Sequence, residues 1–145
     1  MSPPYLSGRK NSHIIGLDVK QYVSADQQAH EILIEIRRRG LTIACHPHHR
    51  TPCRFEVSTC YLLDHRKELA QLVDLWEAAN RDDLFPVTSL KHYPYVASSD
   101  FHTPKHLYWW KTLLRCEKSW PAIKRALRNN ADVALTLFRN GIWRA

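Results

Sequence analysis

Histidine and aspartate side chains follow two short apolar segments of the chain. Leu41–Cys45 runs into His46, and Tyr95–Ser98 runs into Asp100 and His102. Imidazole nitrogens suit divalent ions such as zinc, iron and manganese, and a carboxylate adds a hard oxygen ligand that can bridge two ions. Residues two apart on an extended segment project to the same side, so Asp100 and His102 can both reach one ion. The sequence therefore predicts metal-ligand chemistry after these two segments.

A helix flanked by two strands is predicted in the first third of the chain. Ser24 fits the capping position of this helix, with Gln27 completing a capping box, and apolar residues then recur at the spacing of one helix face. Gly40 is expected to end the helix in a left-handed conformation. His13–Val19 and Leu41–Cys45 are apolar runs of strand length on either side. The three elements together predict a βαβ unit, and therefore a parallel sheet.

Later segments continue the alternation of helices and strands. His65–Leu69 is compatible with a helix, and Leu72–Glu77 is a candidate strand. Glu77 is expected to cap a helix or to lie at a solvated strand end, in preference to the alternative that it binds a metal or supports a metal ligand. Ser119 opens a last predicted helix, and Val133–Phe138 is predicted to be the final strand. Strand ends at the carboxyl side are where parallel α/β folds build their sites.

The polar segments carry a resemblance to a known family. Ala-Cys-His-Pro-His-His at 44–49, followed by Ser-Ser-Asp-Phe-His at 98–102, resembles the third and fourth motifs of the polymerase and histidinol phosphatase (PHP) superfamily of metal-dependent phosphoesterases. Ser12–Leu17 is similar to the family segment in which a ligand histidine opens an apolar strand. The resemblance implies an α/β fold, a partial distorted (β/α)7 barrel that lacks its N-terminal strands, over residues 13–145. Residues 1–12 are expected to be disordered.

The resemblance also implies roles for individual residues. It implies four metal ligands, namely His13, His46, Asp100 and His102. Asp100 and His102 are the expected catalytic residues, and zinc, manganese or iron are the expected ions. The implied reaction is hydrolysis of a phosphate ester by a metal-activated hydroxide. The residues expected to contact the phosphate or to protonate the leaving group are His48, His49 and Arg50.

The chain departs from the family pattern at its N-terminal side. The first motif, a His-x-His after the first strand, is absent, since the only His-x-His here is His46-Pro47-His48, and no acidic residue precedes Asp18. We therefore expect either the C-terminal part of a longer domain, inactive alone, or a diverged single-metal or non-catalytic relative. An incomplete barrel leaves sheet edges open, which predicts an oligomer or a partner that supplies the missing half.

A second class of function uses the cysteines. A zinc-stabilised binding or structural module would draw on six residues, namely Cys45, His46, His48, His49, Cys53 and Cys60. Structural zinc sites commonly pair ligands two to four residues apart. The cysteines here lie eight and seven positions apart, so the sequence favours the phosphoesterase interpretation over this module and over a folded remnant that does no chemistry.

Charge and hydropathy limit the partners. Residues 103–145 hold 9 basic and 2 acidic residues and carry the whole formal charge of +7, while residues 1–102 are balanced. A solvated basic helix face is favoured over a nucleic-acid surface, because no recognised nucleic-acid module accompanies the charge. The expected substrate is a phosphorylated small molecule or a nucleotide. No apolar run approaches the length of a membrane span, so a cytoplasmic protein without a membrane partner is expected.

Overall fold

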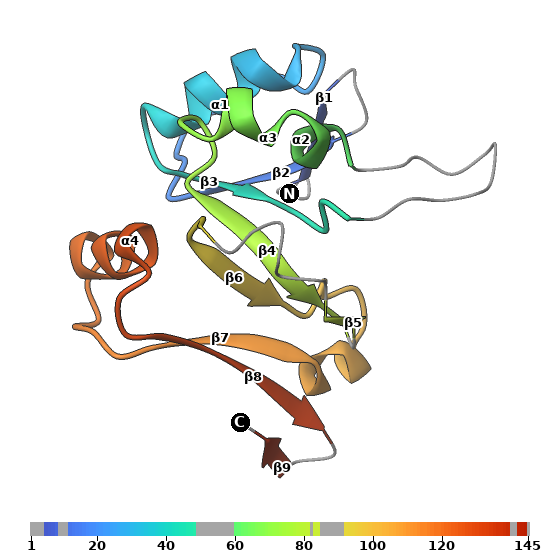
Figure 1. Cartoon of the computed structure of the whole chain (residues 1–145), viewed down its shortest axis with the longest axis vertical. Helices are drawn as coiled ribbons and strands as arrows, with labels where there is room; N and C mark the ends of the chain where they lie inside the picture. Colours follow the sequence, from blue (N-terminus) through green and yellow to red (C-terminus); the bar gives the residue numbers. More distant parts are fainter. Residues whose placement is uncertain are drawn as a thin grey trace, which may run out of the picture. The chain divides into compact units, whose positions relative to one another are not determined.

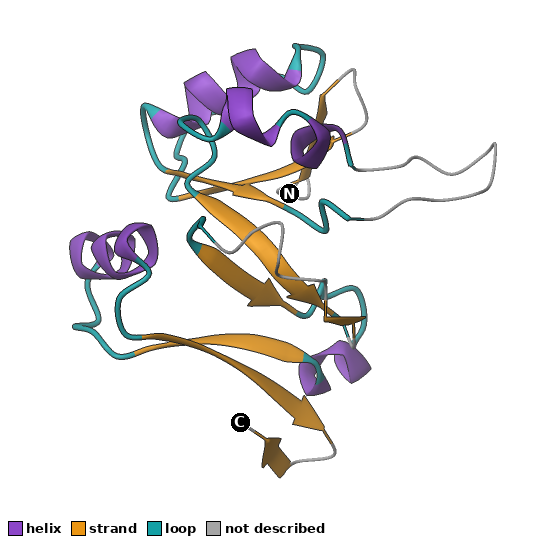
Figure 2. Cartoon of the chain, in the orientation of Figure 1, coloured by secondary structure: helices purple, strands orange, loops and turns teal. Residues whose placement is uncertain are grey.

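The computed structural model describes residues 5–8, 12–48, 60–81, 83–84, 92–139 and 142–144. These residues form helices and strands in a mixed α/β arrangement (Figure 2). The chain divides into two compact units, Met1–Trp76 and Glu77–Ala145. Strand β4 (Leu75–Asn80) crosses the boundary between them.

The first unit is built on three antiparallel strands (Figure 1). Its elements before β4, in chain order, are β1 (Tyr5–Gly8), β2 (Ser12–Leu17), α1 (Ala29–Arg37), β3 (Leu41–Ala44), α2 (Tyr61–Asp64) and α3 (Arg66–Leu69). β3 then pairs in parallel with the first residues of β4. β1 falls inside the segment 1–12, so at Tyr5–Gly8 the structure differs from the expected disordered N-terminus.

The predicted parallel βαβ unit is wrong, because β2 and β3 pair antiparallel. Leu17, at the end of β2, lies opposite Leu41, at the start of β3. The segment 18–28 between β2 and α1 has eleven residues and can extend up to about 36 Å, whereas the nine residues of α1 span about 14 Å. This connection is longer than α1, so it can carry the chain back along the sheet. α1 then returns the chain to the end of the sheet where β2 stops, and β3 begins there.

Both ends of α1 also differ from the prediction. The capping residue is Gln28, which forms a capping box with Glu31, and not Ser24. Gly40 does not adopt the left-handed conformation. A Cβ at Gly40 would lie 2.1 Å from the carbonyl oxygen of Leu17, so glycine is required there by the close approach of two backbones. The apolar face was predicted correctly, since its four residues are buried, namely Ala29, Ile32, Leu33 and Ile36.

A buried polar cluster ties β3 to the start of β4. Thr42 Oγ1 lies 2.7 Å from the Leu72 carbonyl oxygen and accepts a hydrogen bond of 2.7 Å from the Asp74 amide. The Asp74 carboxylate accepts from the Thr42 amide at 3.0 Å and pairs with Arg37 at 2.9 Å. The Thr42 hydroxyl and both carboxylate oxygens of Asp74 have partners, so the cluster fixes where the parallel pairing of β3 and β4 begins.

The second unit holds the remaining strands and the last long helix (Figure 1). After β4, its elements are β5 (Asp83–Leu84), β6 (Tyr95–Ser98), η2 (Pro104–Tyr108), β7 (Trp110–Leu114), α4 (Trp120–Asn129), β8 (Val133–Arg139) and β9 (Ile142–Arg144). β5 pairs antiparallel with β4, and β6 also pairs with β4. β7, β8 and β9 form a separate antiparallel sheet.

The predicted strand at Tyr95–Ser98 and the predicted last helix are confirmed. Ser119 caps α4, accepting a hydrogen bond from the Ala122 amide at 3.4 Å, and Asn130 ends it with a φ of 49°. The strand predicted at Val133–Phe138 is present as β8, but β9 follows it.

A threonine joins β6 to β7. Thr112 Oγ1 accepts from the Ala97 amide at 2.8 Å and donates to the Ala97 carbonyl at 2.8 Å. One hydroxyl thus satisfies both backbone groups that β6 presents at this position. Across the described strands, the two sheets stay open and do not close into a barrel. Within the described part of the chain, no helix is long and apolar enough to cross a membrane.

Candidate functional site

Two predicted metal ligands of the first unit lie side by side. His13 Nδ1 is 3.0 Å from His46 Nε2, although the two residues are 33 positions apart. The rings meet edge to face, with centroids 4.8 Å apart. Antiparallel pairing produces this contact, because it places the start of β2 beside the end of β3, where the Cys45 amide donates to the His13 carbonyl at 3.0 Å.

The chain turns sharply where β3 ends. His46 has a φ of 26°, outside the regions that most residues favour. Cys45 and Pro47 on either side are buried, so packing holds the backbone in this conformation. A non-glycine residue with positive φ beside a second histidine is the kind of local strain that occurs at functional sites.

The chemistry of this histidine pair fits a divalent ion. In a tetrahedral zinc site, two imidazole nitrogens at about 2.0 Å from the ion are about 3.3 Å apart. The observed 3.0 Å separation needs an opening of only a few tenths of an ångström. Within the described ranges, however, no group of three or more His, Cys, Asp or Glu side chains is arranged to hold one ion. In this unit the two imidazoles lie close enough together to reach one ion, and they also lie at hydrogen-bond distance from each other.

The other residues predicted near this site are only partly described. His48 lies two residues after His46 and is half-buried. His49 and Arg50, predicted to contact the phosphate, lie outside the described residues, and so does Cys53 of the alternative zinc module. Cys45 and Cys60 are buried.

In the second unit, Asp100 and His102 follow β6 as predicted. Asp100 has a φ of 47°, so the segment is not simply extended after Ser98. The Asp100 amide lies 3.4 Å from Ser98 Oγ, and His102 Nδ1 lies 2.7 Å from the Asp100 carbonyl oxygen and 3.5 Å from its carboxylate. The two side chains thus share one tight turn.

The turn selects the tautomer of His102. A carbonyl oxygen can only accept, so the 2.7 Å contact requires His102 Nδ1 to carry the hydrogen. In the neutral ring, Nε2 then keeps the lone pair. Histidines that bind metals in proteins commonly donate their other ring nitrogen to a carbonyl or a carboxylate. The geometry of His102 therefore fits a ligand that binds through Nε2.

Arg81 is a site residue that the sequence analysis missed. It follows β4, and its Nε and Nη2 lie 3.0 and 2.9 Å from the same oxygen, Oδ2, of Asp100. The Asp100 side chain is 10% exposed and that of Arg81 is 49% exposed. The Arg81 backbone is fixed from both sides, because its amide donates to Ser98 and its carbonyl accepts from Trp110.

Glu77 is buried, contrary to the expected cap or solvated strand end. It is 1% exposed in the middle of β4, and its carboxylate accepts hydrogen bonds from Asn80 Nδ2 at 3.0 Å and from the Ser98 hydroxyl. Because Ser98 Oγ also lies next to the Asp100 amide, Glu77 supports the turn that carries Asp100. All six residues of β4 are buried, so no alternation of polar and apolar residues in the sequence marks the buried position of Glu77.

His106 orders the segment that follows. Its Nδ1 accepts from the amides of His102 at 2.8 Å and Thr103 at 3.3 Å, and its ring stacks on Trp109 with centroids 4.1 Å apart. A Thr-Pro pair with a polar side chain three residues later is a helix-start signal, and it could have indicated this role from the sequence. Nearby, burial lowers the pKa of Lys111, whose Nζ donates to the carbonyls of Trp109 and Trp110.

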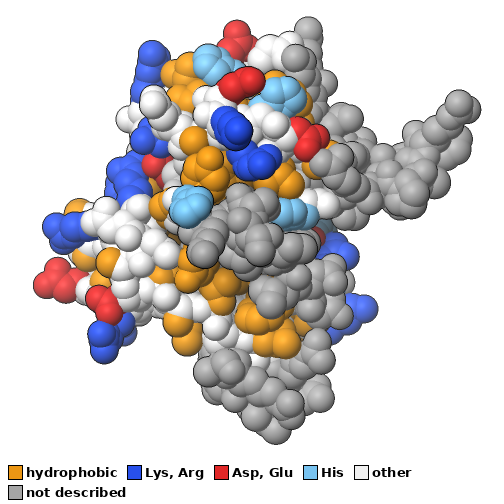
Figure 3. All heavy atoms as spheres, viewed as in Figure 1, with side chains coloured by type: hydrophobic (Ala, Val, Ile, Leu, Met, Phe, Trp, Pro, Cys, Tyr) orange, Lys and Arg blue, Asp and Glu red, His pale blue; other side chains and the backbone are white. Residues whose placement is uncertain are grey.

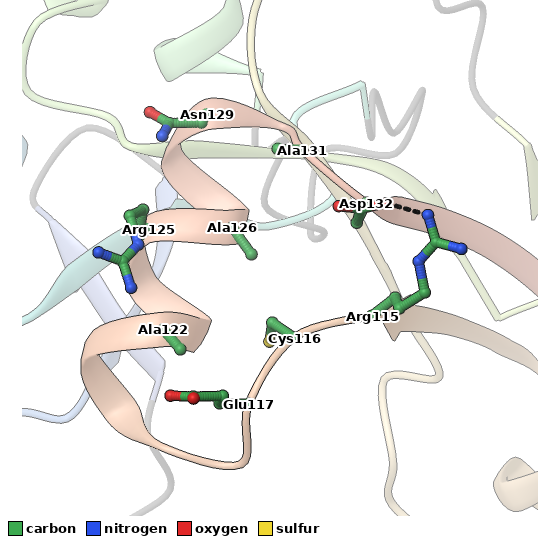
Figure 4. A pocket seen from close by; sticks show the side chains of 9 residues that line it. All are labelled: Arg115, Cys116, Glu117, Ala122, Arg125, Ala126, Asn129, Ala131 and Asp132. Atoms are coloured by element: carbon green, nitrogen blue, oxygen red, sulfur yellow. Dashed lines mark hydrogen bonds and ion pairs between the residues drawn. The ribbon is translucent and has the colours of Figure 1, made fainter.

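A separate hollow lies between α4 and the chain that leaves β7 (Figure 4). It has a volume of about 300 Å³, and Arg115, Cys116, Arg125 and Asp132 are among its lining residues. Arg115 and Asp132 form an ion pair of 2.7 Å at its edge (Figure 4). None of the predicted site residues that the structure describes lines this hollow, so it is distinct from the Asp100 turn.

Comparison with known proteins gives no family. No protein-family model matches the chain, and no curated protein matches it.

Proposed function

We propose that this chain carries part of the active site of a PHP-type metal-dependent phosphoesterase. The observation that carries the proposal is the contact between His13 and His46, 3.0 Å apart at two ring nitrogens and 33 positions apart in sequence. Both are residues that the family resemblance marks as ligands. A pair that is distant in sequence and convergent in space is more specific than either motif alone.

The turn after β6 adds independent support. Asp100 and His102 lie in one tight turn, and the Nδ1 hydrogen of His102 is directed to a backbone carbonyl. Oxygen and imidazole donors of this kind suit zinc, manganese and iron, which are the ions we propose. We further propose that β3, β4 and β6 belong to an incomplete (β/α) barrel, consistent with the parallel pairing of β3 with β4.

In the proposed reaction, His13, His46, Asp100 and His102 hold the ions. Bound ions of this kind supply a hydroxide nucleophile at neutral pH and neutralise charge on the phosphate. The chain's own contribution is to fix the ligands, by the β2–β3 pairing in one unit and by the Glu77 and His106 contacts in the other. His48, His49 and Arg50 are proposed to contact the phosphate or to protonate the leaving group.

The proposed substrate is a phosphorylated small molecule or a nucleotide, with nucleic acid less favoured. We also propose that a second copy or another chain completes the site, and that the protein acts in the cytoplasm. Figure 3 shows hydrophobic side chains, in orange, at the surface among the charged ones. Of the described residues of the second unit, Leu107, Tyr108 and Leu113 are 53%, 45% and 44% exposed. Exposed apolar groups of this size are consistent with such a partner.

Metal binding by the full chain tests the proposal. We would titrate Mn²⁺ by calorimetry into wild type and the variants His13→Ala and His46→Ala. Mn²⁺ is chosen in place of zinc because scattered surface histidines bind Mn²⁺ more weakly than they bind zinc. Loss of a ligand should weaken binding by at least about 100-fold, since even outer contacts of metal ligands contribute 10- to 100-fold. His30→Ala is the matched control, because His30 is exposed on α1 of the same unit.

Hydrolysis of p-nitrophenyl phosphate with Mn²⁺ is the second measurement. Activity that Asp100→Asn abolishes while the fold persists supports the phosphoesterase. Equal Mn²⁺ affinity in wild type, His13→Ala and His46→Ala would contradict the proposed role of the histidine pair. Metal binding without hydrolysis, even after addition of a partner, would favour a non-catalytic relative.

A further inference from the structure

An exposed tyrosine lies at the end of η2, with its ring stacked on a residue of β8. The centroids of the Tyr108 and Phe138 rings are 5.6 Å apart, and the angle between the two ring planes is 18°. η2 lies against β8 (Figure 1). Tyr108 is nevertheless 45% exposed. A ring that is supported on one face and still this exposed offers its other face as a flat surface on which a further aromatic group can stack.

The backbone that carries this ring is held in place. Thr103 and His106 form a capping box at the start of η2, and Pro104 lies in its first turn. The His106 ring is buried and stacks on Trp109, with centroids 4.1 Å apart. The tyrosine is therefore already positioned before anything binds to it, which lowers the entropy cost of binding.

A lysine lies one turn before the tyrosine. In a 3₁₀ helix, side chains three positions apart lie over one another, so Lys105 and Tyr108 share one side of η2. Lys105 is exposed. At a rise of about 2.0 Å per residue, the two Cα atoms lie about 6 Å apart along the helix axis. A nucleotide joins a flat base to a phosphate through one sugar, so a base stacked on Tyr108 places its phosphate within reach of the flexible lysine.

The charge around η2 is positive. Residues 101–111 contain two lysines and two histidines and no acidic residue. Asp100, just before this segment, is paired with Arg81. The two acidic residues that follow it in the sequence, Glu117 and Asp132, both line the hollow beside α4, which no residue of η2 lines. Cations beside an exposed aromatic ring complement single-stranded nucleic acid, whose bases can stack and whose phosphates are negative.

We propose that η2 forms part of a binding surface for single-stranded nucleic acid, on which Tyr108 stacks against a base and Lys105 pairs with a phosphate of the same strand. This binding requires no metal ion and is independent of the proposed hydrolysis. A strand fits an open surface better than a free nucleotide does, because its neighbouring bases and phosphates add contacts. A duplex fits less well, because its bases are already stacked on one another.

Oligonucleotide binding by the full chain tests the inference. We would measure the fluorescence anisotropy of a labelled oligo-dT of about 12 nucleotides, a length typical of single-strand binding sites, with EDTA in every sample. Tyr108→Leu keeps an apolar side chain against Phe138 but removes the ring. It should weaken binding by at least about fivefold, the lower end of what one stacked base contributes. Tyr108→Phe keeps the ring and should bind within about twofold of wild type. Tyr22→Leu is the matched control, because Tyr22 is an exposed tyrosine of the first unit.

The salt dependence of binding tests the lysine. Each phosphate of a single strand that a cation neutralises contributes about 0.7 to the slope of log affinity against log salt concentration. Lys105→Gln should therefore lower this slope by about 0.7, whereas Lys118→Gln, at another exposed lysine of the same unit, should leave it unchanged. Circular dichroism melts would show whether each variant is folded. Lys105→Gln changes only an exposed side chain, so it decides the question if Tyr108→Leu does not fold.

Three results would overturn the inference. The first is a folded Tyr108→Leu variant that binds the strand as tightly as wild type. The second is displacement of the strand by thymidine monophosphate at the same nucleotide concentration, which would assign the surface to free nucleotides. The third is a wild-type chain that does not bind the strand; if Tyr108→Leu then alters its sedimentation, the surface contacts protein instead. None of these results depends on Mn²⁺ binding, so failure of the proposed phosphoesterase is distinguishable from failure of this inference.

Discussion

Replacement of Glu77 by glutamine tests whether the buried carboxylate supports the Asp100 turn. Glu77 lies in the middle of β4 with 1% of its surface exposed, and two donors, Asn80 Nδ2 and the Ser98 hydroxyl, reach separate oxygens. Glutamine has the same size and shape. It keeps one acceptor oxygen but presents an NH₂ group to the second donor, so the perturbation is chemical rather than steric.

The expected cost follows from these two contacts. Hydrogen bonds to a charged acceptor contribute about 1.5–3 kcal/mol each, and a neutral one contributes about 1 kcal/mol. Glutamine therefore replaces about 3–6 kcal/mol with about 1 kcal/mol, while burial of a neutral amide recovers part of the loss. We expect the free energy of unfolding to fall by about 2 kcal/mol, which with a typical urea slope lowers the midpoint by about 1 M.

Urea unfolding monitored by tryptophan fluorescence measures this change. Glu117→Gln is the matched control, because Glu117 is exposed in the same unit and its replacement should leave the midpoint within about 0.3 M. Mn²⁺ affinity should fall in Glu77→Gln and stay unchanged in the control. A Glu77→Gln variant as stable as wild type would refute the reasoning, because glutamine would then mimic a carboxyl group that is already protonated.

Three further substitutions test the packing that positions the strands. Thr42→Val removes the hydroxyl that contacts Leu72 and Asp74 and should cost about 2–3 kcal/mol in urea unfolding, because two buried backbone groups lose their partner; a loss below 0.5 kcal/mol would contradict this. Gly40→Ala forces a Cβ against the Leu17 carbonyl and should cost more than about 2 kcal/mol in thermal unfolding, whereas an unchanged melting temperature would show that the two backbones can separate. Ser119→Ala should cost about 1 kcal/mol, with Ser119→Asp retaining the wild-type stability as a second cap; equal stability of all three proteins would argue against a capping role.

Local patterns in the sequence predicted several elements correctly. Tyr95–Ser98 is a strand, α4 begins after Ser119, and the buried face of α1 matches its apolar spacing. These features depend on residues within a few positions of one another. Secondary-structure propensity and hydrophobic periodicity depend on neighbouring residues, so they can predict features of this kind.

Pairing direction could not be predicted in the same way. A strand, a helix and a strand suggested a parallel unit, but the length of segment 18–28 allowed the helix to run back toward the end of β2. The antiparallel pairing is what brings the two histidines of the candidate site together. A parallel β3 would have placed His46 at the opposite end of the sheet from His13, whereas the antiparallel pair places their ring nitrogens in contact.

The contacts around Asp100 could not be predicted from local sequence patterns either. The resemblance indicated Asp100 and His102, but Arg81 lies 19 positions earlier and Glu77 further still. Both come from β4 or the residue that follows it, and the pairing of β4 with β6 brings them to the turn. Nothing in the spacing of a single motif encodes contacts between two strands.

The hydroxyl of Thr112 has a consequence for how the protein behaves at high concentration. β6 pairs with β4 along one side, and on the other side Thr112 occupies both backbone groups of Ala97. An uncovered strand edge is a template on which another chain can add a strand, the first step of intermolecular β-aggregation. Thr112, a residue of β7, therefore covers the edge of β6 at Ala97 with a side-chain hydroxyl in place of backbone pairing at that position.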